Sequence, residues 1–284
     1  MRHYDTAIIG SGYFSAGFAL SHPDSIVIER THLCDGRFYA RLNGFTLPEN
    51  VKNTQKTALA VELRAHYLSL GMERGGLFHV CASESALCNF LRKTGEQTHM
   101  PEFLLNTTCI GVEKQAENGV FRLTLCHNGG LETITAAHVI DTRTHAPKNT
   151  LNVLCMRTAD GISVPTECAP FDLGVFAGTG MRVSFEPAFY PEQFVLRFAW
   201  QDAKNINEAK CELYRAWKKC VPKDRAKMIQ TAYRMYGEAP SGARALTRDE
   251  AGVLHVCEAA FGSVYEAFDC GAGDVYGNGG ENQC

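Results

Sequence analysis

The hydrophobic and polar positions of the first 30 residues predict a strand, a helix and a second strand. Residues 4–9 and residues 25–28 are the expected strands, and both are predicted to be fully buried. Residues 16–20 form a short helical pattern between them, which His22-Pro23-Asp24 ends. The order strand, helix, strand is that of a βαβ unit.

Later segments predict a larger sheet and then a change of pattern near residue 150. Before this point, we expect strands at residues 77–81, 102–106, 109–114, 120–126, 131–135 and 138–141, and helices at residues 56–70 and from a Ser83 cap to residue 93. After it, we expect strands at residues 153–156, 171–176, 181–187 and 193–200, and helices at residues 208–220 and 225–236. The pattern closes with a strand at residues 252–256 and a helix at residues 264–270.

The turn after the first strand has the pattern GxGxxS, in Gly10-Ser11-Gly12-Tyr13-Phe14-Ser15. Gly10 permits a tight turn, and Gly12 lets the backbone approach a pyrophosphate that lies on the helix N-terminus. Ser15 is a small residue at the place where a third glycine allows close packing. Glu29 ends the second strand, 17 residues after Gly12, where it can accept hydrogen bonds from a ribose 2′-hydroxyl. These features predict a dinucleotide site; a glycine-rich turn without a ligand is the alternative.

Composition narrows the class of protein. The 284 residues are 45% hydrophobic and 21% charged, which excludes a disordered, collagen-like or fibrous chain. The net charge of −3 argues against a nucleic-acid partner, and no uncharged apolar segment reaches the roughly 18 residues of a membrane helix. The first residues lack the features of a signal peptide. We therefore expect no nucleic-acid or membrane partner and a cytoplasmic protein.

The sequence contains twelve cysteines, and no pair of them has CxxC spacing. Zinc ribbons, iron–sulfur clusters and thioredoxin-type redox pairs need tighter clustering, so no metal site is predicted. Several cysteines lie within apolar runs, and all twelve are predicted to be free thiols that pack as small hydrophobic side chains. Such thiols fit a reducing cytoplasm.

Four motifs together are similar to those of a known family. They are the GxGxxS turn with Glu29-Arg30, the stretch 103–112 around Cys109-Ile110, the stretch 137–144 that ends in Thr142-Arg143-Thr144, and the stretch 252–260 around Cys257-Glu258. Over about residues 1–145 and 252–272, the chain resembles the FAD-dependent oxidoreductases with a glutathione-reductase-type FAD domain, the FAD-oxidored family. The resemblance implies an α/β fold with a Rossmann-like FAD-binding domain on a parallel sheet, and FAD as the cofactor.

The resemblance also implies roles for individual residues. The backbone near Cys109 would lie against the adenine, the acid Glu258 would bind the ribityl chain, and the helix that begins near Ser263 would point its N-terminus at the flavin ring. Arg37 would contact a phosphate or the ribityl chain. The expected cofactor-binding residues are Gly10, Gly12, Tyr13, Phe14, Ser15, Glu29, Arg30, Arg37, Cys109, Ile110, Thr142, Arg143, Glu258, Gly262, Ser263 and Val264. The sequence does not identify catalytic residues.

The sequence departs from the family pattern at several motifs. Thr142-Arg143-Thr144 replaces Ala-Thr-Gly, and Cys257-Glu258 replaces Gly-Asp with an acid that is one methylene longer. Cys34-Asp35-Gly36 stands where the family often has a Gly-Gly pair. No second GxGxxG turn opens a helix, so a built-in NAD(P)H domain is not expected.

The expected function is that of an FAD-dependent oxidoreductase that acts on a small organic substrate through the flavin. One alternative is a flavin-binding electron-transfer subunit with a redox partner protein; another is a degenerate nucleotide-binding member without turnover. We expect residues 1–150 and 241–272 to form the FAD-binding domain, residues 151–240 an α+β cap or substrate domain, and residues 273–284 a flexible tail. The strand at residues 252–256 should therefore pair with the N-terminal sheet.

Overall fold

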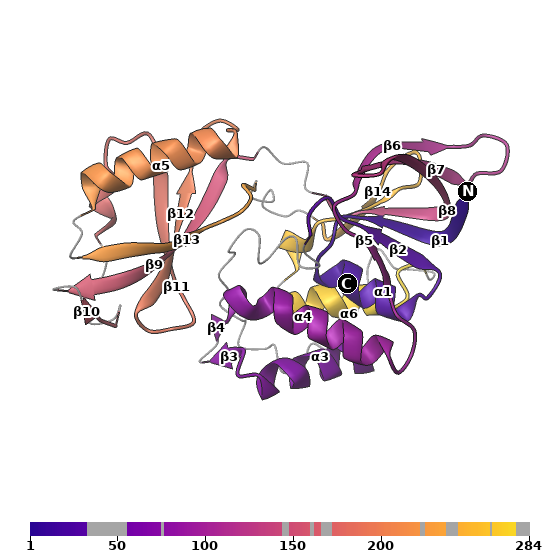
Figure 1. The fold of residues 1–284 in the computed structure, drawn as a ribbon, viewed down its shortest axis with the longest axis horizontal. Coiled ribbons are helices and arrows are strands. Elements are labelled where there is room, and N and C mark those ends of the chain that lie inside the picture. Colours follow the sequence, from indigo (N-terminus) through magenta and orange to yellow (C-terminus); the bar gives the residue numbers. More distant parts are fainter. Residues whose placement is uncertain are drawn as a thin grey trace.

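The computed structural model describes residues 1–32, 56–74, 77–143, 148–159, 162–165, 172–221, 225–236, 244–261 and 263–276. These residues form two lobes, each built on its own sheet (Figure 1). The first lobe has a mainly parallel sheet with helices along one face, and the second has an antiparallel sheet with the helix α5 (Ile206–Cys220). The predicted α/β fold, with a Rossmann-like sheet and a second α+β unit, is confirmed. None of the described helices is long and apolar enough to cross a membrane.

The sheet of the first lobe has the strand order β14-β15-β8-β1-β2-β5, and the hairpin of β6 and β7 is attached to β8. The strands are β1 (Arg2–Ile9), β2 (Ser25–Ile28), β5 (Glu102–Leu104), β6 (Thr108–Lys114), β7 (Phe121–His127), β8 (Gly130–Asp141), β14 (Leu246–Arg248) and β15 (Leu254–Val256). β1 pairs in parallel with β2 and with β8, so Ile9 lies between Ile28 and Asp141. β15 pairs in parallel with β8, with Leu254 opposite Ile140. The predicted pairing of this late strand with the N-terminal sheet is confirmed.

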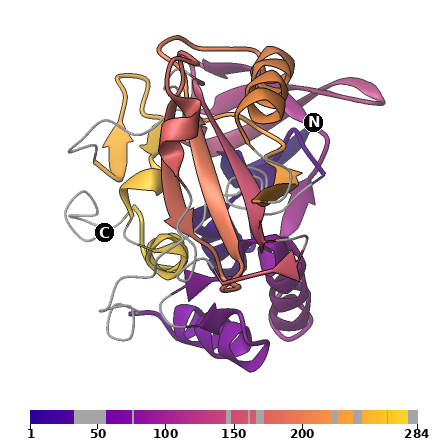
Figure 2. The same cartoon turned by 90° about the vertical axis from the view of Figure 1, so that its left-hand side faces the viewer.

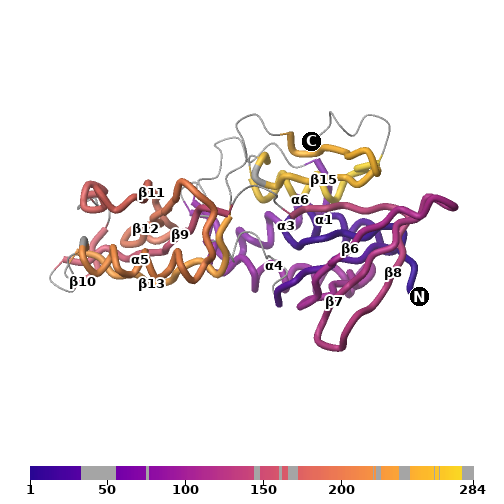
Figure 3. The backbone as a smooth tube through the Cα atoms, turned by 90° about the horizontal axis from the view of Figure 1, so that it is seen from above, coloured from indigo at the N-terminus to yellow at the C-terminus, as the bar shows by residue number. Residues whose placement is uncertain are grey.

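The described helices of the first lobe lie along one face of this sheet (Figures 1 and 3). They are α1 (Tyr13–Ser21), α3 (Ala58–Ser69), α4 (Val80–Gly95) and α6 (Val264–Ala272), and a small hairpin of β3 (Glu73–Arg74) and β4 (Leu77–Phe78) lies beside them. α1 and α6 approach so closely that both need glycine. A Cβ atom at Gly17 would overlap the carbonyl oxygen of Phe268, and one at Gly271 would overlap the carbonyl oxygen of Phe14.

The sheet of the second lobe faces the viewer in Figure 2. It has the strand order β10-β9-β12-β11, and β13 pairs with β9. Its strands are β9 (Thr150–Ala159), β10 (Ile162–Ser163), β11 (Arg182–Pro187), β12 (Gln193–Ala199) and β13 (Ala226–Thr231). All of these pairs are antiparallel. α5 covers the sheet with Ala209 and Leu213, which are buried in one cluster with Phe198.

Two elements of the second lobe differ from the prediction. The predicted helix at residues 225–236 is wrong, because its first half is the strand β13, which runs antiparallel to β9 with Ala226 opposite Arg157. Pairing with β9 is a tertiary interaction that outweighs a local helical pattern. The predicted strand at residues 171–176 is also wrong, since Leu173–Phe176 form a 3₁₀ turn, η3. The Asp172 side chain caps this turn by accepting from the Gly174 amide at 2.8 Å.

Two predicted boundaries in the first lobe are wrong as well. The two strands expected at residues 131–135 and 138–141 are the single strand β8, because β1 pairs with it in one register on both sides of the expected break, from Ile134 to Asp141. The strand expected at residues 77–81 ends at Phe78. His79 then caps α4 through its Nδ1, which accepts from the Ala82 amide at 3.1 Å, so Ser83 lies inside the helix and does not cap it.

The segment after α6 also packs on the first lobe where the structure describes it. Val275 is buried, and the Tyr276 ring meets the Phe18 ring edge to face at a centroid distance of 6.1 Å. Most of the expected tail from residue 273, and the loop from Thr31 to Glu49 beyond its first two residues, lie outside the described residues.

Eight of the twelve cysteines have described side chains. Seven of these eight are free thiols: Cys81, Cys88, Cys109, Cys126, Cys155, Cys211 and Cys257. Burial raises the pKa of the Cys81, Cys109 and Cys155 thiols, which keeps them protonated at neutral pH. Cys270, in α6, is disulfide-bonded, so the prediction that all twelve cysteines are free is wrong.

The contact between α1 and α6 can be tested with Gly17→Ala. Alanine would stabilise an isolated helix by about 1 kcal/mol relative to glycine. Here the new Cβ has no space, so the free energy of unfolding should fall by about 1–3 kcal/mol, as for other overpacked sites. Gly273→Ala, at the C-cap of α6, is the matched control because its Cβ would make only ordinary contacts. Denaturant unfolding that shows Gly17→Ala to be as stable as this control would contradict the packing.

Candidate nucleotide-binding site

A pocket opens at the carboxyl ends of β1 and β2 in the first lobe. Its wall contains the turn residues Gly10 and Ser11, the acid Glu29 and Cys109. Four cations also line it: Arg30, Arg143, Lys148 and Arg234. About 720 Å³ of space outside the protein atoms, part of it open to solvent, lies within this pocket. In a parallel sheet, ligands bind at the carboxyl ends of the strands, at the point where the connections to the two neighbouring strands run in opposite directions. In this sheet that point is at β1, which lies between β2 and β8.

The glycine turn is held by hydrogen bonds that use two of the predicted site residues. Gly10 has φ 99°, a left-handed conformation that favours glycine. The Ser15 hydroxyl donates to the Gly10 carbonyl oxygen at 2.8 Å, so this serine fixes the turn as well as permitting close packing. The Thr142 hydroxyl donates to the Ile9 carbonyl oxygen at 3.0 Å and fills the space beside Gly10.

Glu29 is almost fully buried at the end of β2, and five donors hold its carboxylate. Oε2 accepts from the amide and the hydroxyl of Ser11 at 3.0 and 3.1 Å, and Oε1 accepts from the amide and the hydroxyl of Thr31, both at 2.8 Å. Arg234 adds an ion pair of 2.7 Å to Oε1. Burial raises the pKa of Glu29, but the Arg234 charge and the hydrogen bonds outweigh burial and hold this pKa below its usual value. Since a carboxylate has about four acceptor sites, a ribose hydroxyl must replace one of these donors.

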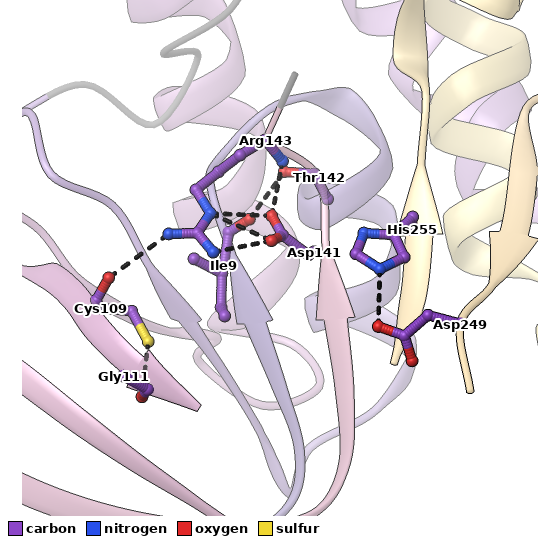
Figure 4. Close-up of polar contacts among 8 residues, drawn as sticks. All are labelled: Ile9, Cys109, Gly111, Asp141, Thr142, Arg143, Asp249 and His255. Carbon is purple, nitrogen blue, oxygen red and sulfur yellow. Dashed lines mark hydrogen bonds and ion pairs between the residues drawn. The ribbon is translucent and has the colours of Figure 1, made fainter. Parts of the chain in front are cut away.

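Arg143 and Arg30 bring positive charge to the wall of the pocket. Arg143 donates to both carboxylate oxygens of Asp141 at 2.7–3.1 Å and to the Cys109 carbonyl oxygen at 3.4 Å (Figure 4). Arg30 is exposed and has no ion-pair partner among the described residues. Partial desolvation of its guanidinium lowers the pKa of Arg30, and the charges of Arg234 and Arg143 lower it further, against a smaller opposite effect of the Glu29 charge. An anionic ligand would relieve this repulsion.

The carboxylate of Glu258 lies at the N-terminus of α1. Glu258 begins the 3₁₀ turn η4 (Glu258–Ala260) after β15, and it is 3% exposed. Its Oε1 accepts from the Phe14 amide at 3.1 Å, and both of its carboxylate oxygens lie where a Cβ atom at Gly12 would be. Gly12 has φ 175°, which any residue adopts, so the contact with Glu258 is what requires glycine there. α1 has no side-chain N-cap, and Glu258 supplies the negative charge that a helix N-terminus favours.

The structure brings together part of the predicted site. The predicted residues that line the pocket are Gly10, Glu29, Arg30, Cys109 and Arg143. Ile110 does not line it, and its side chain is 58% exposed. Tyr13 and Val264 are buried in the hydrophobic core, and Ser263 caps α6 by accepting from the Glu266 amide at 3.1 Å. Two further predicted residues, Arg37 and Gly262, lie outside the described residues.

Sequence reasoning missed two of the cations, Lys148 and Arg234. Neither lies in a motif, and Arg234 follows β13 in a stretch predicted to be helical. The sequence did offer one signal for Arg234, since a carboxylate expected to be buried, such as that of Glu29, needs a cationic partner. That signal does not say which of the 28 lysines and arginines supplies the charge.

A second pocket lies between the two lobes. β4 and the start of α4 form one wall, and the second sheet forms the other; the wall residues include Phe78, Leu154, Phe189 and Val195. His79 also lines it, with its ring centroid 4.8 Å from that of Phe189. This pocket is mainly apolar, which is typical of a site for a small organic ligand.

Comparison with known proteins identifies the fold. No protein-family model and no curated protein matches the sequence. The solved structure of OxyS anhydrotetracycline hydroxylase from Streptomyces rimosus matches with a TM-score of 0.56 and 11% identity, over 95% of this chain and 60% of its own. p-Nitrophenol 4-monooxygenase PnpA from Pseudomonas putida DLL-E4 matches with a TM-score of 0.53 and 11% identity, over 96% of this chain and 77% of its own. Aklavinone-11 hydroxylase, in a ternary complex with FAD and aklavinone, matches with a TM-score of 0.51 and 11% identity, over 95% of this chain and 61% of its own.

The chain shares its fold with aklavinone-11 hydroxylase, whose structure was solved with FAD and aklavinone. It spans less than two thirds of the OxyS and aklavinone-11 hydroxylase structures, and about three quarters of PnpA. At 11% identity, the likeness shows the fold alone.

The Glu29–Arg234 pair can be tested with Glu29→Gln. This substitution should lower the free energy of unfolding by about 3 kcal/mol near neutral pH, because it leaves a half-buried arginine without its carboxylate. The pKa of Glu29 is below its usual value in the folded protein, so its contribution to stability is present above the unfolded pKa and is lost as the pH falls through the folded pKa. The difference between the two proteins should therefore shrink below about pH 4.3.

Denaturant unfolding at a series of pH values measures this difference. Glu102→Gln is the control, since the Glu102–Arg2 pair is exposed and its loss should cost less than about 1 kcal/mol. A stability difference for Glu29→Gln that is independent of pH down to the acid transition would contradict the assignment of charge to Glu29.

Proposed function

We propose that this protein is an FAD-dependent oxidoreductase that acts on a small organic substrate. The observation that carries the proposal is the pocket at the carboxyl ends of β1 and β2, where a glycine turn, the buried acid Glu29 and several cations lie together. The same fold holds FAD in the aklavinone-11 hydroxylase complex. We propose a glutathione-reductase-type FAD domain from residues 1–150 and 241–272, with residues 151–240 as the cap.

The residues around the pocket fit the adenosine side of FAD. Gly10 and Ser11 let a ligand approach the main chain, and Glu29 is an acceptor for a ribose hydroxyl that replaces one of its donors. Arg30 and Arg143 supply positive charge toward phosphate groups. The N-terminus of α1 is the proposed seat of the pyrophosphate, and the Glu258 carboxylate must leave it for FAD to bind there.

Bound FAD would supply the redox chemistry, because a flavin accepts and donates hydride or electrons. The chain would bind the substrate, orient it and exclude water. We propose the apolar pocket between the lobes for this purpose, since Phe78, Leu154 and Phe189 offer hydrophobic walls. His79 is held there by its Nδ1, which accepts from the Ala82 amide, so the neutral ring carries its proton on Nε2.

A nucleotide-binding protein without turnover is the second candidate. One observation favours it: the Glu258 carboxylate lies at the α1 N-terminus, where a dinucleotide would place its pyrophosphate. The electron-transfer subunit, its redox partner protein and the cytoplasmic location remain sequence-based predictions. The disulfide at Cys270 is unusual for a reducing compartment, whereas the seven free cysteines are typical of one.

The visible absorption spectrum of the purified protein tests the proposal most directly. A flavin spectrum, either as purified or after addition of FAD, is expected. Bleaching of this spectrum by a small organic substrate alone, without a partner protein, would identify an oxidoreductase. A colourless protein that binds adenine nucleotides but cannot be reconstituted with FAD would favour the second candidate.

Arg30→Ala gives a test of the pocket that leaves the fold intact, because Arg30 is exposed and makes no described ion pair. The variant should bind FAD about tenfold more weakly, the scale of one lost charge-assisted hydrogen bond. Titration of the flavin-free protein with FAD, followed by flavin fluorescence, measures the affinity. Arg92→Ala, an exposed arginine on α4 that pairs with Glu96, is the matched control. Equal affinities for the two variants would place the nucleotide elsewhere.

A further inference from the structure

Glu258 brings a buried negative charge to the helix end where a nucleotide phosphate is expected. The carboxylate touches Gly12 and accepts from the Phe14 amide at 3.1 Å, and the residue is 3% exposed. A helix N-terminus stabilises an anion through the amides of its first turn. A pyrophosphate at this end would need the same amides and would be repelled by the carboxylate, so the two anions exclude each other.

We propose that Glu258 weakens the binding of nucleotides that carry a pyrophosphate, FAD included, because its carboxylate occupies the α1 N-terminus that the pyrophosphate needs. The inference rests on the proposed nucleotide site. A nucleoside that binds beside Gly10 and Glu29 leaves Glu258 in place. Nucleotides with a pyrophosphate, such as ADP and FAD, bind in competition with it.

The length of the side chain accounts for its reach. The main chain here is fixed to the first sheet: the Cys257 amide donates to the Ala245 carbonyl oxygen at 2.7 Å, and Leu254 pairs with Ile140 of β8. With the main chain held there, the Glu258 side chain is long enough for its carboxylate to reach the first turn of α1.

The selectivity can be measured by isothermal titration calorimetry with adenosine, ADP and FAD. The proteins are the wild type, Glu258→Gln, Glu258→Ala and the control Glu250→Gln, which removes an exposed carboxylate between β14 and β15. Glu258→Gln keeps the side-chain length and an oxygen that can accept from the Phe14 amide, whereas Glu258→Ala empties the place. ADP and FAD should bind both Glu258 variants tighter than the wild type by about tenfold or more, since a close like charge has been removed. The affinity for adenosine should not change, and Glu250→Gln should match the wild type for all three ligands.

Thermal unfolding of the ligand-free proteins provides a second readout. A purely structural Glu258 would lower the unfolding temperature on substitution without any gain in ADP affinity. ADP binding by both Glu258 variants that is equal to or weaker than that of the wild type would overturn the selectivity and, if FAD binds the wild type, would leave the proposed function standing. If the wild type and both variants bind none of the three ligands, the proposed function fails and this inference fails with it.

Discussion

The close approach of α1 and α6 is the contact on which the first lobe depends. Gly17 and Gly271 let each helix reach the main chain of the other, so two segments from opposite ends of the chain form one layer. Asp269 of α6 extends this layer, because its carboxylate accepts from the amides of Lys56 and Thr57 at 2.8 and 2.7 Å and so holds the start of α3. β15 and η4 precede α6 closely. The same contact therefore keeps β15 beside β8 and the Glu258 carboxylate on α1.

An ion pair joins the two lobes at the mouth of the candidate site. Glu29 directly follows β2 in the first lobe, Arg234 follows β13 in the second, and their side chains are 4% and 16% exposed. A buried pair of this kind is favourable only when further hydrogen bonds satisfy the charges, which Ser11 and Thr31 do for Glu29. Both lobes thus contribute to the wall of one pocket. Its electrostatic character is set by residues that no single sequence motif contains.

The fold could be predicted from the sequence better than the candidate site could. The first βαβ unit and the late strand rest on local signals: apolar runs, the spacing of Gly10 and Gly12, and an acid at a strand end. β13 could not be found in this way, because its pairing with β9 is a tertiary interaction that overrides the local pattern. The partner of Glu29 lies 205 residues away. The Glu258 carboxylate meets the Phe14 amide from 244 residues away, so no local motif could place it at the α1 N-terminus.

The pairing of β15 with β8 has a consequence for how the chain is made. β8 ends at Asp141 and its partner begins at Leu254, and all strands of the second sheet are synthesised between them. Until β15 leaves the ribosome, the end of β8 has an unpaired edge on that side, and such edges recruit other strands. α1 also lacks its packing partner α6 until this part of the chain has been synthesised. The lobe whose strands emerge first is therefore the last to be completed, and its long-range contacts belong to the kind that slow folding and expose intermediates to aggregation.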